Sequence, residues 1–171
     1  MNLEEKTLEE KSLYEGSFLK LVKQKVLLPD GKTSERDIVR HPGGVAILAF
    51  NKDKLLLVEQ YRKALDKPLI EIPAGKIEKN EDIKICAIRE LEEETGYKAG
   101  KIEFLGKFAT SPGFCDEYIY LFKAEELSKG VIGGDDDEFI NIKEYTLEEV
   151  KNMIKTGKLE DCKTIAAMQF L

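Results

Sequence analysis

The stretch from Gly75 to Tyr97 places the tightest constraint on how this 171-residue chain can fold. It opens as a loop that begins with glycine and continues as a helix. Asn80 has the side chain of an N-cap, and Gly96 suits the left-handed position that ends a helix. The sequence therefore predicts a helix over residues 81–95.

Four glutamates crowd the C-terminal turns of this predicted helix, where the helix dipole favours cations instead. They are Glu90, Glu92, Glu93 and Glu94. Like charges three or four positions apart repel by about 0.2–0.5 kcal/mol per pair. Ala87 lies near the side that carries Glu90 and Glu94, so these acids border the core-facing stripe, whereas Glu92 points away and is expected to be solvated. A hard divalent cation between the carboxylates would offset the repulsion. The alternative is an ordinary charged surface helix.

The spacing of this stretch resembles the Nudix box, the signature of hydrolases that cleave a nucleoside diphosphate linked to another group. All defined positions of the box are filled, namely by Gly75, Glu81, Arg89, Glu90, Leu91, Glu93, Glu94, Gly96 and Tyr97. The resemblance implies an α/β fold, the Nudix α/β/α sandwich, in which helices pack on a mixed sheet.

The pattern of the remaining chain agrees with a mixed sheet covered by helices. The apolar run Val45–Phe50 is typical of a buried strand. Further strands are predicted over residues 18–28, 33–39, 55–62, 69–73, 101–109, 117–124 and 139–145. Further helices are predicted over 147–155, with Thr146 as the N-cap, and over 161–171. Residues 1–12 are rich in Glu and Lys and are predicted to be a frayed start or a short helix.

Segments outside the box resemble the ADP-ribose pyrophosphatase branch of the family. They are Val58–Arg62, Leu69–Gly75 and Ser111–Gly113, with Pro112 lying 15 residues after Tyr97. The resemblance implies hydrolysis of ADP-ribose to AMP and ribose 5-phosphate. The alternatives are hydrolysis of another nucleoside diphosphate sugar or a dinucleotide, and a non-catalytic sensor that only binds ADP-ribose.

His41–Gly44 marks a boundary between two parts of the chain. Residues 1–43 are expected to form a small N-terminal antiparallel β segment, and residues 44–171 the Nudix hydrolase domain. A hairpin alone is only marginally stable, so the N-terminal segment needs a partner surface on its own domain or on a second subunit. Many members of the branch exchange N-terminal strands, and the resemblance therefore implies a homodimer.

The box carries the expected metal site. By position, the resemblance assigns Glu90 and Glu94 as metal ligands and Ala74 as a ligand through its backbone carbonyl. Glu93 matches a ligand or a water-activating residue, so Glu93 and Glu94 are the catalytic candidates on the helix. Arg89 matches an arginine that orients the carboxylates, and the alternative is a surface ion pair worth about 1 kcal/mol or less. Mg²⁺ is the expected cofactor, with Mn²⁺ as the alternative.

The substrate-binding candidates lie outside the box. Arg62 corresponds to an arginine near the substrate phosphates, and its planar fork suits a phosphate. Arg40 is a similar candidate, and Pro112 and Gly113 belong to the loop that marks the branch.

The acidic loop before the last strand supplies further catalytic candidates. Members of the branch usually place a catalytic glutamate there, and the possible general bases in this sequence are Asp136 and Glu138. The alternative is a solvated acidic loop without a role in the reaction.

The net charge of −6 argues against a broad surface for nucleic acid or for an anionic membrane. It allows an anionic substrate, because a bound cation inverts the local field. No cysteine pair has CxxC spacing, so neither a zinc site nor a disulfide framework is predicted, and Cys86 is expected in the core. Free thiols fit a reducing cytoplasm. No apolar run reaches about 18 residues, so no membrane span is predicted. The expected partner is a small nucleotide.

Overall fold

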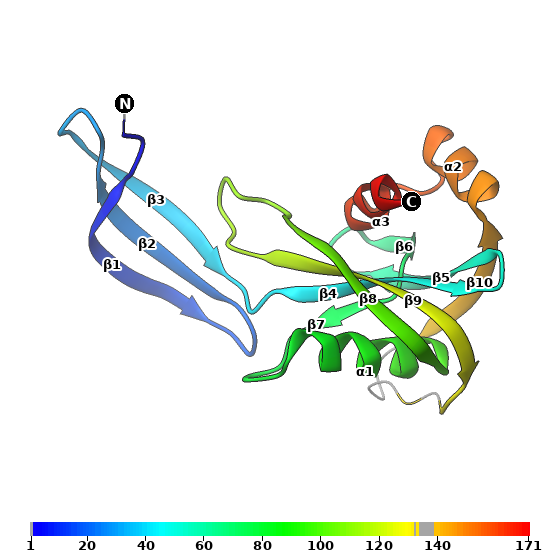
Figure 1. Cartoon of the computed structure of the whole chain (residues 1–171). Coiled ribbons are helices and arrows are strands. Elements are labelled where there is room, and N and C mark those ends of the chain that lie inside the picture. Colours follow the sequence, from blue (N-terminus) through cyan, green and yellow to red (C-terminus); the bar gives the residue numbers. More distant parts are fainter. Residues whose placement is uncertain (1, 132, 134–138) are drawn as a thin grey trace. The chain divides into compact units, whose positions relative to one another are not determined.

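The computed structural model describes residues 2–131, 133 and 139–171. It divides into two compact units (Figure 1). The first unit comprises Met1–Gly43 and Ala109–Tyr118, and the second comprises Gly44–Phe108 and Ile119–Leu171. The chain contains both the mixed sheet with packed helices and the small antiparallel N-terminal sheet, so the predicted fold class is confirmed.

The first unit is built on a three-stranded antiparallel sheet in the order β1-β2-β3. The strands are β1 (Lys6–Glu15), β2 (Lys20–Leu27) and β3 (Thr33–Arg40). The prediction of a frayed start or short helix over residues 1–12 is wrong, because β1 pairs with β2 from Lys6↔Leu27 to Glu15↔Lys20. The edge of β2 offers backbone partners along this length, and such tertiary pairing overrides local preference.

The second unit contains a seven-stranded sheet with the path β10-β5-β4-β9-β8, to which β6 adds beside β5 and β7 beside β4. Its strands are β4 (Gly44–Asn51), β5 (Lys54–Arg62), β6 (Lys67–Glu71), β7 (Ala74–Lys76), β8 (Tyr97–Ala109), β9 (Tyr118–Lys129) and β10 (Ile140–Thr146). β4 runs parallel to β9 and antiparallel to β5 and β7, so the sheet is mixed. The sequence did not predict the short strand β7.

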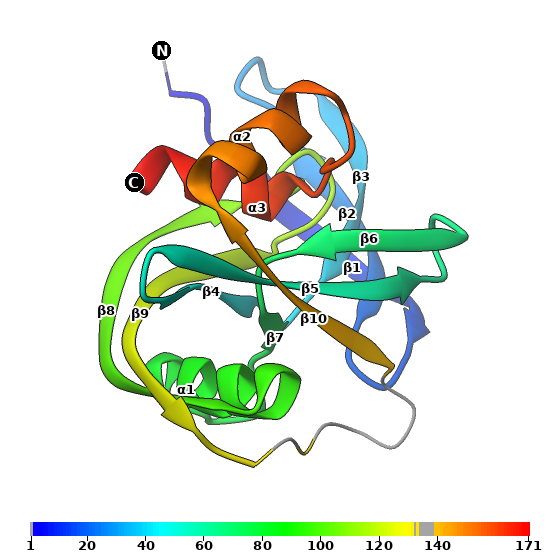
Figure 2. The same cartoon turned by 90° about the vertical axis from the view of Figure 1, so that its right-hand side faces the viewer.

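Helices cover both faces of this sheet. They are α1 (Ile83–Thr95), α2 (Leu147–Lys155) and α3 (Cys162–Ala167), followed by the 3-10 turn Met168–Phe170. Figure 2 shows α1 below the sheet and α2 and α3 above it. The central strand β4 is buried and alternates between two cores. The core beneath includes Val45, Ile47, Ala49, Cys86, Ala87 and Leu91, and the core above includes Ala46, Leu48, Val150, Met153 and Ala167.

Helix α1 begins later than the sequence predicts. Asp82, and not Asn80, is its N-cap, since the Asp82 carboxylate accepts from the backbone N–H groups of Lys84 and Ile85. Asn80 instead takes a left-handed conformation with φ of 65° in the preceding loop. Gly96 ends the helix in the left-handed conformation with φ of 67°, as predicted.

The two C-terminal helices are short. Thr146 is the N-cap of α2, as predicted, and forms a capping box with Glu149. The single helix predicted over 161–171 is shorter, since α3 ends at Ala167 and a 3-10 turn follows. Among the helices of the described residues, none is long and apolar enough to cross a membrane.

Candidate active site

Strand β7 brings a glycine into close contact with helix α1. A Cβ atom built on Gly75 would lie 1.9 Å from Cδ of Glu90, so the Glu90 carboxylate fills the space that any side chain at position 75 would need. The neighbouring Ala74 donates its backbone N–H to Oε2 of Glu94 at 2.9 Å. Two adjacent residues of one strand therefore lie against two carboxylates of the helix.

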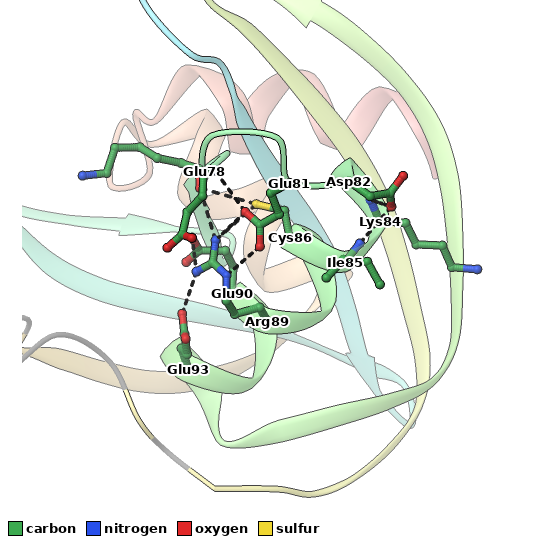
Figure 3. Close-up of polar contacts among 10 residues, drawn as sticks. Glu78, Glu81, Asp82, Lys84, Ile85, Cys86, Arg89, Glu90 and Glu93 are labelled. Carbon is green, nitrogen blue, oxygen red and sulfur yellow. Dashed lines mark hydrogen bonds and ion pairs between the residues drawn. The ribbon is translucent and has the colours of Figure 1, made fainter. Parts of the chain in front are cut away.

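Arg89 joins three carboxylates of this site (Figure 3). Its Nε and Nη2 donate to the two carboxylate oxygens of Glu81 at 2.8 and 2.9 Å. Its Nη1 donates to Glu90 at 2.9 Å and to Glu93 at 2.8 Å. The guanidinium therefore limits repulsion between Glu90 and Glu93 and sets their orientation.

The predicted helix placed Glu81 in its first turn, but the structure does not. Glu81 precedes α1, and its side chain is only 11% exposed. The hydrogen bonds from Arg89 lower the pKa of Glu81 to about 2. The Arg89 pKa rises in response, with its hydrogen bonds to Glu81 as the main cause. Arg89 and Glu81 are therefore both charged across the range in which enzymes work.

Cys86 lies beneath this cluster and is buried, as predicted. Its thiol lies 3.4 Å from the backbone carbonyl oxygen of Lys76 and donates to it. Burial, assisted by the negative charge of Glu81, raises the pKa of the Cys86 thiol to about 12. Cys86 is thus an uncharged core group that packs under Arg89.

The carboxylates of α1 have the chemistry that a divalent cation requires. Glu90, Glu93 and Glu94 offer oxygen donors, which Mg²⁺ and Mn²⁺ prefer. Glu94 is 6% exposed, and one of its oxygens is already held by Ala74. Across residues 2–131, 133 and 139–171, no three His, Cys, Asp or Glu side chains are arranged to enclose a metal ion. Glu90 and Glu93 share Arg89 instead. The donor set and the close approach of the Glu90 carboxylate to the backbone at Gly75 fit a metal site.

The sequence analysis predicted that Glu92 is solvated, and this prediction is wrong. Its carboxylate accepts from the backbone N–H of Val131 at 3.1 Å and forms an ion pair with Lys98 at 3.3 Å. The Val131 contact is the main cause of a lowered Glu92 pKa. Glu92 therefore fixes the chain that leaves β9 to the C-terminal end of α1.

Arg62 ends strand β5 and is bound to a carboxylate of its own sheet. Its Nε and Nη2 donate to the two oxygens of Glu71 in β6 at 2.7 and 2.6 Å. Lys163 of α3 donates to the same carboxylate and forms an ion pair with Asp161 at 3.1 Å. Glu71 is only 1% exposed, so this carboxylate between two cations is buried.

The sequence analysis missed the role of Glu71. A signal was present, because Glu71 is the one charged residue in the apolar segment Leu69–Ile72. Burial raises its pKa, but Arg62 and Lys163 together lower it below its ordinary value. Its partner Lys163 lies 92 residues away in sequence, and no local pattern joins the two.

The other predicted site residues lie elsewhere. Arg40 ends β3 in the first unit and binds Asp116 at 3.0 Å and Glu10 at 3.1 Å. Pro112 and Gly113 belong to segment 109–118 of the same unit. Asp136 and Glu138 lie outside the described residues.

Replacing Glu81 by Gln tests the carboxylate that anchors Arg89. We expect the free energy of unfolding at pH 7 to fall by about 1.5–3 kcal/mol, the usual value for hydrogen bonds to charged groups. The Glu81 pKa is about 2 in the folded chain against an ordinary 4.5, so its stabilisation is complete above pH 4.5 and is lost as the pH falls towards 2. Urea unfolding at pH 7 and pH 3 measures the free energy of unfolding of the unmodified protein and of Glu81→Gln. The difference between the two proteins should be smaller at pH 3 than at pH 7.

The control is Glu78→Gln, since Glu78 is an exposed glutamate of the same loop. It should change stability by no more than about 0.5 kcal/mol. If Glu81→Gln lowered the free energy of unfolding equally at both pH values, the stabilisation would not come from the charge of Glu81.

Known proteins resemble this chain over almost its whole length. A family model described as NUDIX domain matches residues 40–168. The "Methanol dehydrogenase activator" of Bacillus methanolicus is 51% identical over 171 residues, covering 98% of this chain and 92% of that protein. The "ADP-ribose pyrophosphatase" of Bacillus subtilis is 45% identical over 175 residues, covering 99% of this chain and 94% of that protein.

A solved structure has the same fold. The crystal structure titled "ADP compounds hydrolase" superposes with a TM-score of 0.88 and covers 99% of this chain and 94% of its own, at 18% identity. The family model and the relatives cover the carboxylates of α1, Arg89 and Gly75, whose geometry is described above. This chain belongs to the Nudix hydrolase family.

Proposed function

We propose that this protein hydrolyses the diphosphate bond of ADP-ribose to AMP and ribose 5-phosphate with the help of a divalent metal ion. The observation that carries the proposal is the placement of Glu90 and Glu94 against Gly75 and Ala74, beside Arg89. The 45% identity to an ADP-ribose pyrophosphatase supports the choice of substrate.

In this proposal Glu90, Glu94 and the backbone carbonyl of Ala74 hold the cation, and Glu93 is a further ligand or the base. Mg²⁺ is the proposed metal and Mn²⁺ the alternative. When bound, such an ion neutralises diphosphate charge and lowers the pKa of a water molecule. Arg89 orients Glu90 and Glu93, and the N–H of Ala74 fixes one oxygen of Glu94.

Substrate contacts are proposed for the residues outside α1. Arg62 would bind a phosphate, and its Nη1 makes no hydrogen bond to any residue that the structure describes. Arg40, Pro112 and Gly113 are further proposed substrate contacts. Proton removal from the attacking water is assigned to Glu93, with Asp136 and Glu138 as alternatives.

The variant Glu94→Gln tests the metal site while keeping the shape of the side chain. Removing a residue that hydrogen-bonds to a metal ligand lowers metal affinity or activity by about 10–100-fold. Loss of the ligand itself should therefore lower kcat at saturating Mg²⁺ by at least about 100-fold. AMP release is the measurement, and circular dichroism verifies folding. Glu148→Gln, at an exposed glutamate of α2, is the control. Turnover of Glu94→Gln near that of the unmodified protein would refute the metal assignment.

A substrate panel tests the assignment of ADP-ribose. Values of kcat/KM for ADP-ribose, ADP-glucose, GDP-mannose and NADH should be highest for ADP-ribose. A higher value for another compound would identify a different nucleoside diphosphate sugar or a dinucleotide as the substrate. Binding of ADP-ribose without AMP release in excess Mg²⁺ or Mn²⁺ would identify a non-catalytic sensor.

The most similar relative described above suggests a second candidate function. Because a protein named methanol dehydrogenase activator is 51% identical, this chain is a candidate activator of such a dehydrogenase. Adding the protein and its Glu94→Gln variant to a methanol dehydrogenase assay would show whether activation occurs and whether it needs the Nudix carboxylates.

We also propose a cytoplasmic homodimer that exchanges N-terminal strands and has no nucleic-acid or membrane partner. All ten residues of β1 are exposed, and they include Leu8, Leu13 and Tyr14. A second copy would cover this edge strand and its apolar side chains. The net charge of −6 agrees with the absence of a nucleic-acid partner.

Light scattering after gel filtration tests the dimer. The unmodified protein should have twice the mass of one chain, and the double variant Leu8→Lys with Leu13→Lys should shift towards the monomer, since two charges would be buried in the interface. Leu65→Lys, at an exposed leucine of the second unit, is the control and should remain dimeric. A monomeric unmodified protein would reject the proposal.

A further inference from the structure

Glu71 is a buried carboxylate that binds two cations from different elements. Both of its oxygens accept from Arg62, through Nε at 2.7 Å and Nη2 at 2.6 Å. Oε2 also accepts from Lys163, whose side chain is 13% exposed. A buried carboxylate needs compensation, and the two-nitrogen contact with Arg62 supplies the geometry for it. The second cation, Lys163, therefore calls for its own explanation.

The position of Glu71 connects it to the candidate metal site. Glu71 is three residues before Ala74, whose N–H binds Glu94. Between them, Ile72 donates its N–H to Oγ1 of Thr164 in α3 at 2.9 Å. The segment 71–74 thus contacts α3 above the sheet at one end and α1 below it at the other.

Arg62 is held on two of its three nitrogens. Its side chain is 39% exposed although Glu71 is almost wholly buried, so the guanidinium reaches from the interior to the surface. The fork geometry of Arg and carboxylate fixes the plane of the guanidinium. Nη1 remains for a ligand, because it makes no hydrogen bond within the described part of the chain.

We propose that Glu71 and Lys163 are positioning residues of the active site. Glu71 fixes the guanidinium of Arg62 so that Nη1 can bind a phosphate of the substrate, and Lys163 holds the Glu71 carboxylate in place from α3. The substrate side of this inference rests on the proposed function. In this proposal neither residue contacts the substrate, and both act through Arg62.

A simpler role would be to attach α3 to the sheet. Thr164→Val separates the two roles. It removes the contacts of Thr164 Oγ1 with Ile72 and with Asp161, and it replaces none of the three residues that form the Glu71 contacts with Lys163 and Arg62. Anchoring alone predicts that Thr164→Val and Lys163→Met have similar effects on stability and on KM. Positioning predicts that only variants that disturb Glu71 or Lys163 raise KM.

Steady-state kinetics with ADP-ribose test the positioning role. Glu71→Gln should raise KM about tenfold, the effect of one lost hydrogen bond to a charged group, and should leave kcat nearly unchanged, since binding is lost equally in ground and transition states. Lys163→Met should change KM in the same direction, and Lys163→Arg should restore it. In an Arg62→Ala background, Glu71→Gln should have no additional effect, because the two residues act as one unit.

A second measurement does not depend on the substrate. The Nε–H signal of Arg62 in a ¹H–¹⁵N NMR spectrum should be visible in the unmodified protein and in Thr164→Val, and should be lost in Glu71→Gln. If ADP-ribose is not hydrolysed but this pattern holds, the proposed function fails and the positioning of Arg62 stands. Lys163→Met serves for both measurements if Glu71→Gln does not fold.

Three results would overturn the inference. The first is an unchanged KM and Arg62 signal in both Glu71→Gln and Lys163→Met. The second is an effect of Glu71→Gln on KM that persists in the Arg62→Ala background. The third is a rise in KM with Thr164→Val as large as that with Lys163→Met.

Discussion

The close approach of helix α1 to strand β7 is the contact on which the site depends. It requires a residue without a side chain at position 75, because the Glu90 carboxylate lies where a Cβ atom would be. The adjacent N–H of Ala74 then reaches Glu94 one helical turn further on. A single backbone segment thereby lies against two acids that repel each other at an unfavourable end of the helix, and it binds one of them.

Arg89 makes this concentration of charge compatible with folding. Its guanidinium contacts Glu81, Glu90 and Glu93 and lies over the buried Cys86. Since Glu81 precedes the helix, Arg89 also attaches the loop to the helix. The same contacts that stabilise the turn therefore orient the carboxylates that the proposed metal would need. Glu71 plays a comparable part for Arg62 and Lys163.

Much of the fold and of the site could be predicted because the signals were local. Helical periodicity placed Ala87 near the core-facing stripe and Glu94 at its border, and both are buried. Gly96 and Thr146 were predicted from capping preferences and act as predicted. Two predictions failed because a distant partner decided the outcome. β1 became a strand because β2 offered its edge, and Glu92 found the N–H of Val131, 39 residues away.

The sequence by itself determined the family and the acidic helix, since box spacing and helical geometry act within 23 residues of chain. Only the tertiary structure decided which partner each charge takes. Arg62 has a fork suited to phosphate, but folding binds two of its nitrogens to Glu71, which Lys163 reaches from 92 residues away. The physical reason is that a buried carboxylate must be compensated, and which cations compensate it depends on how the strands and helices pack.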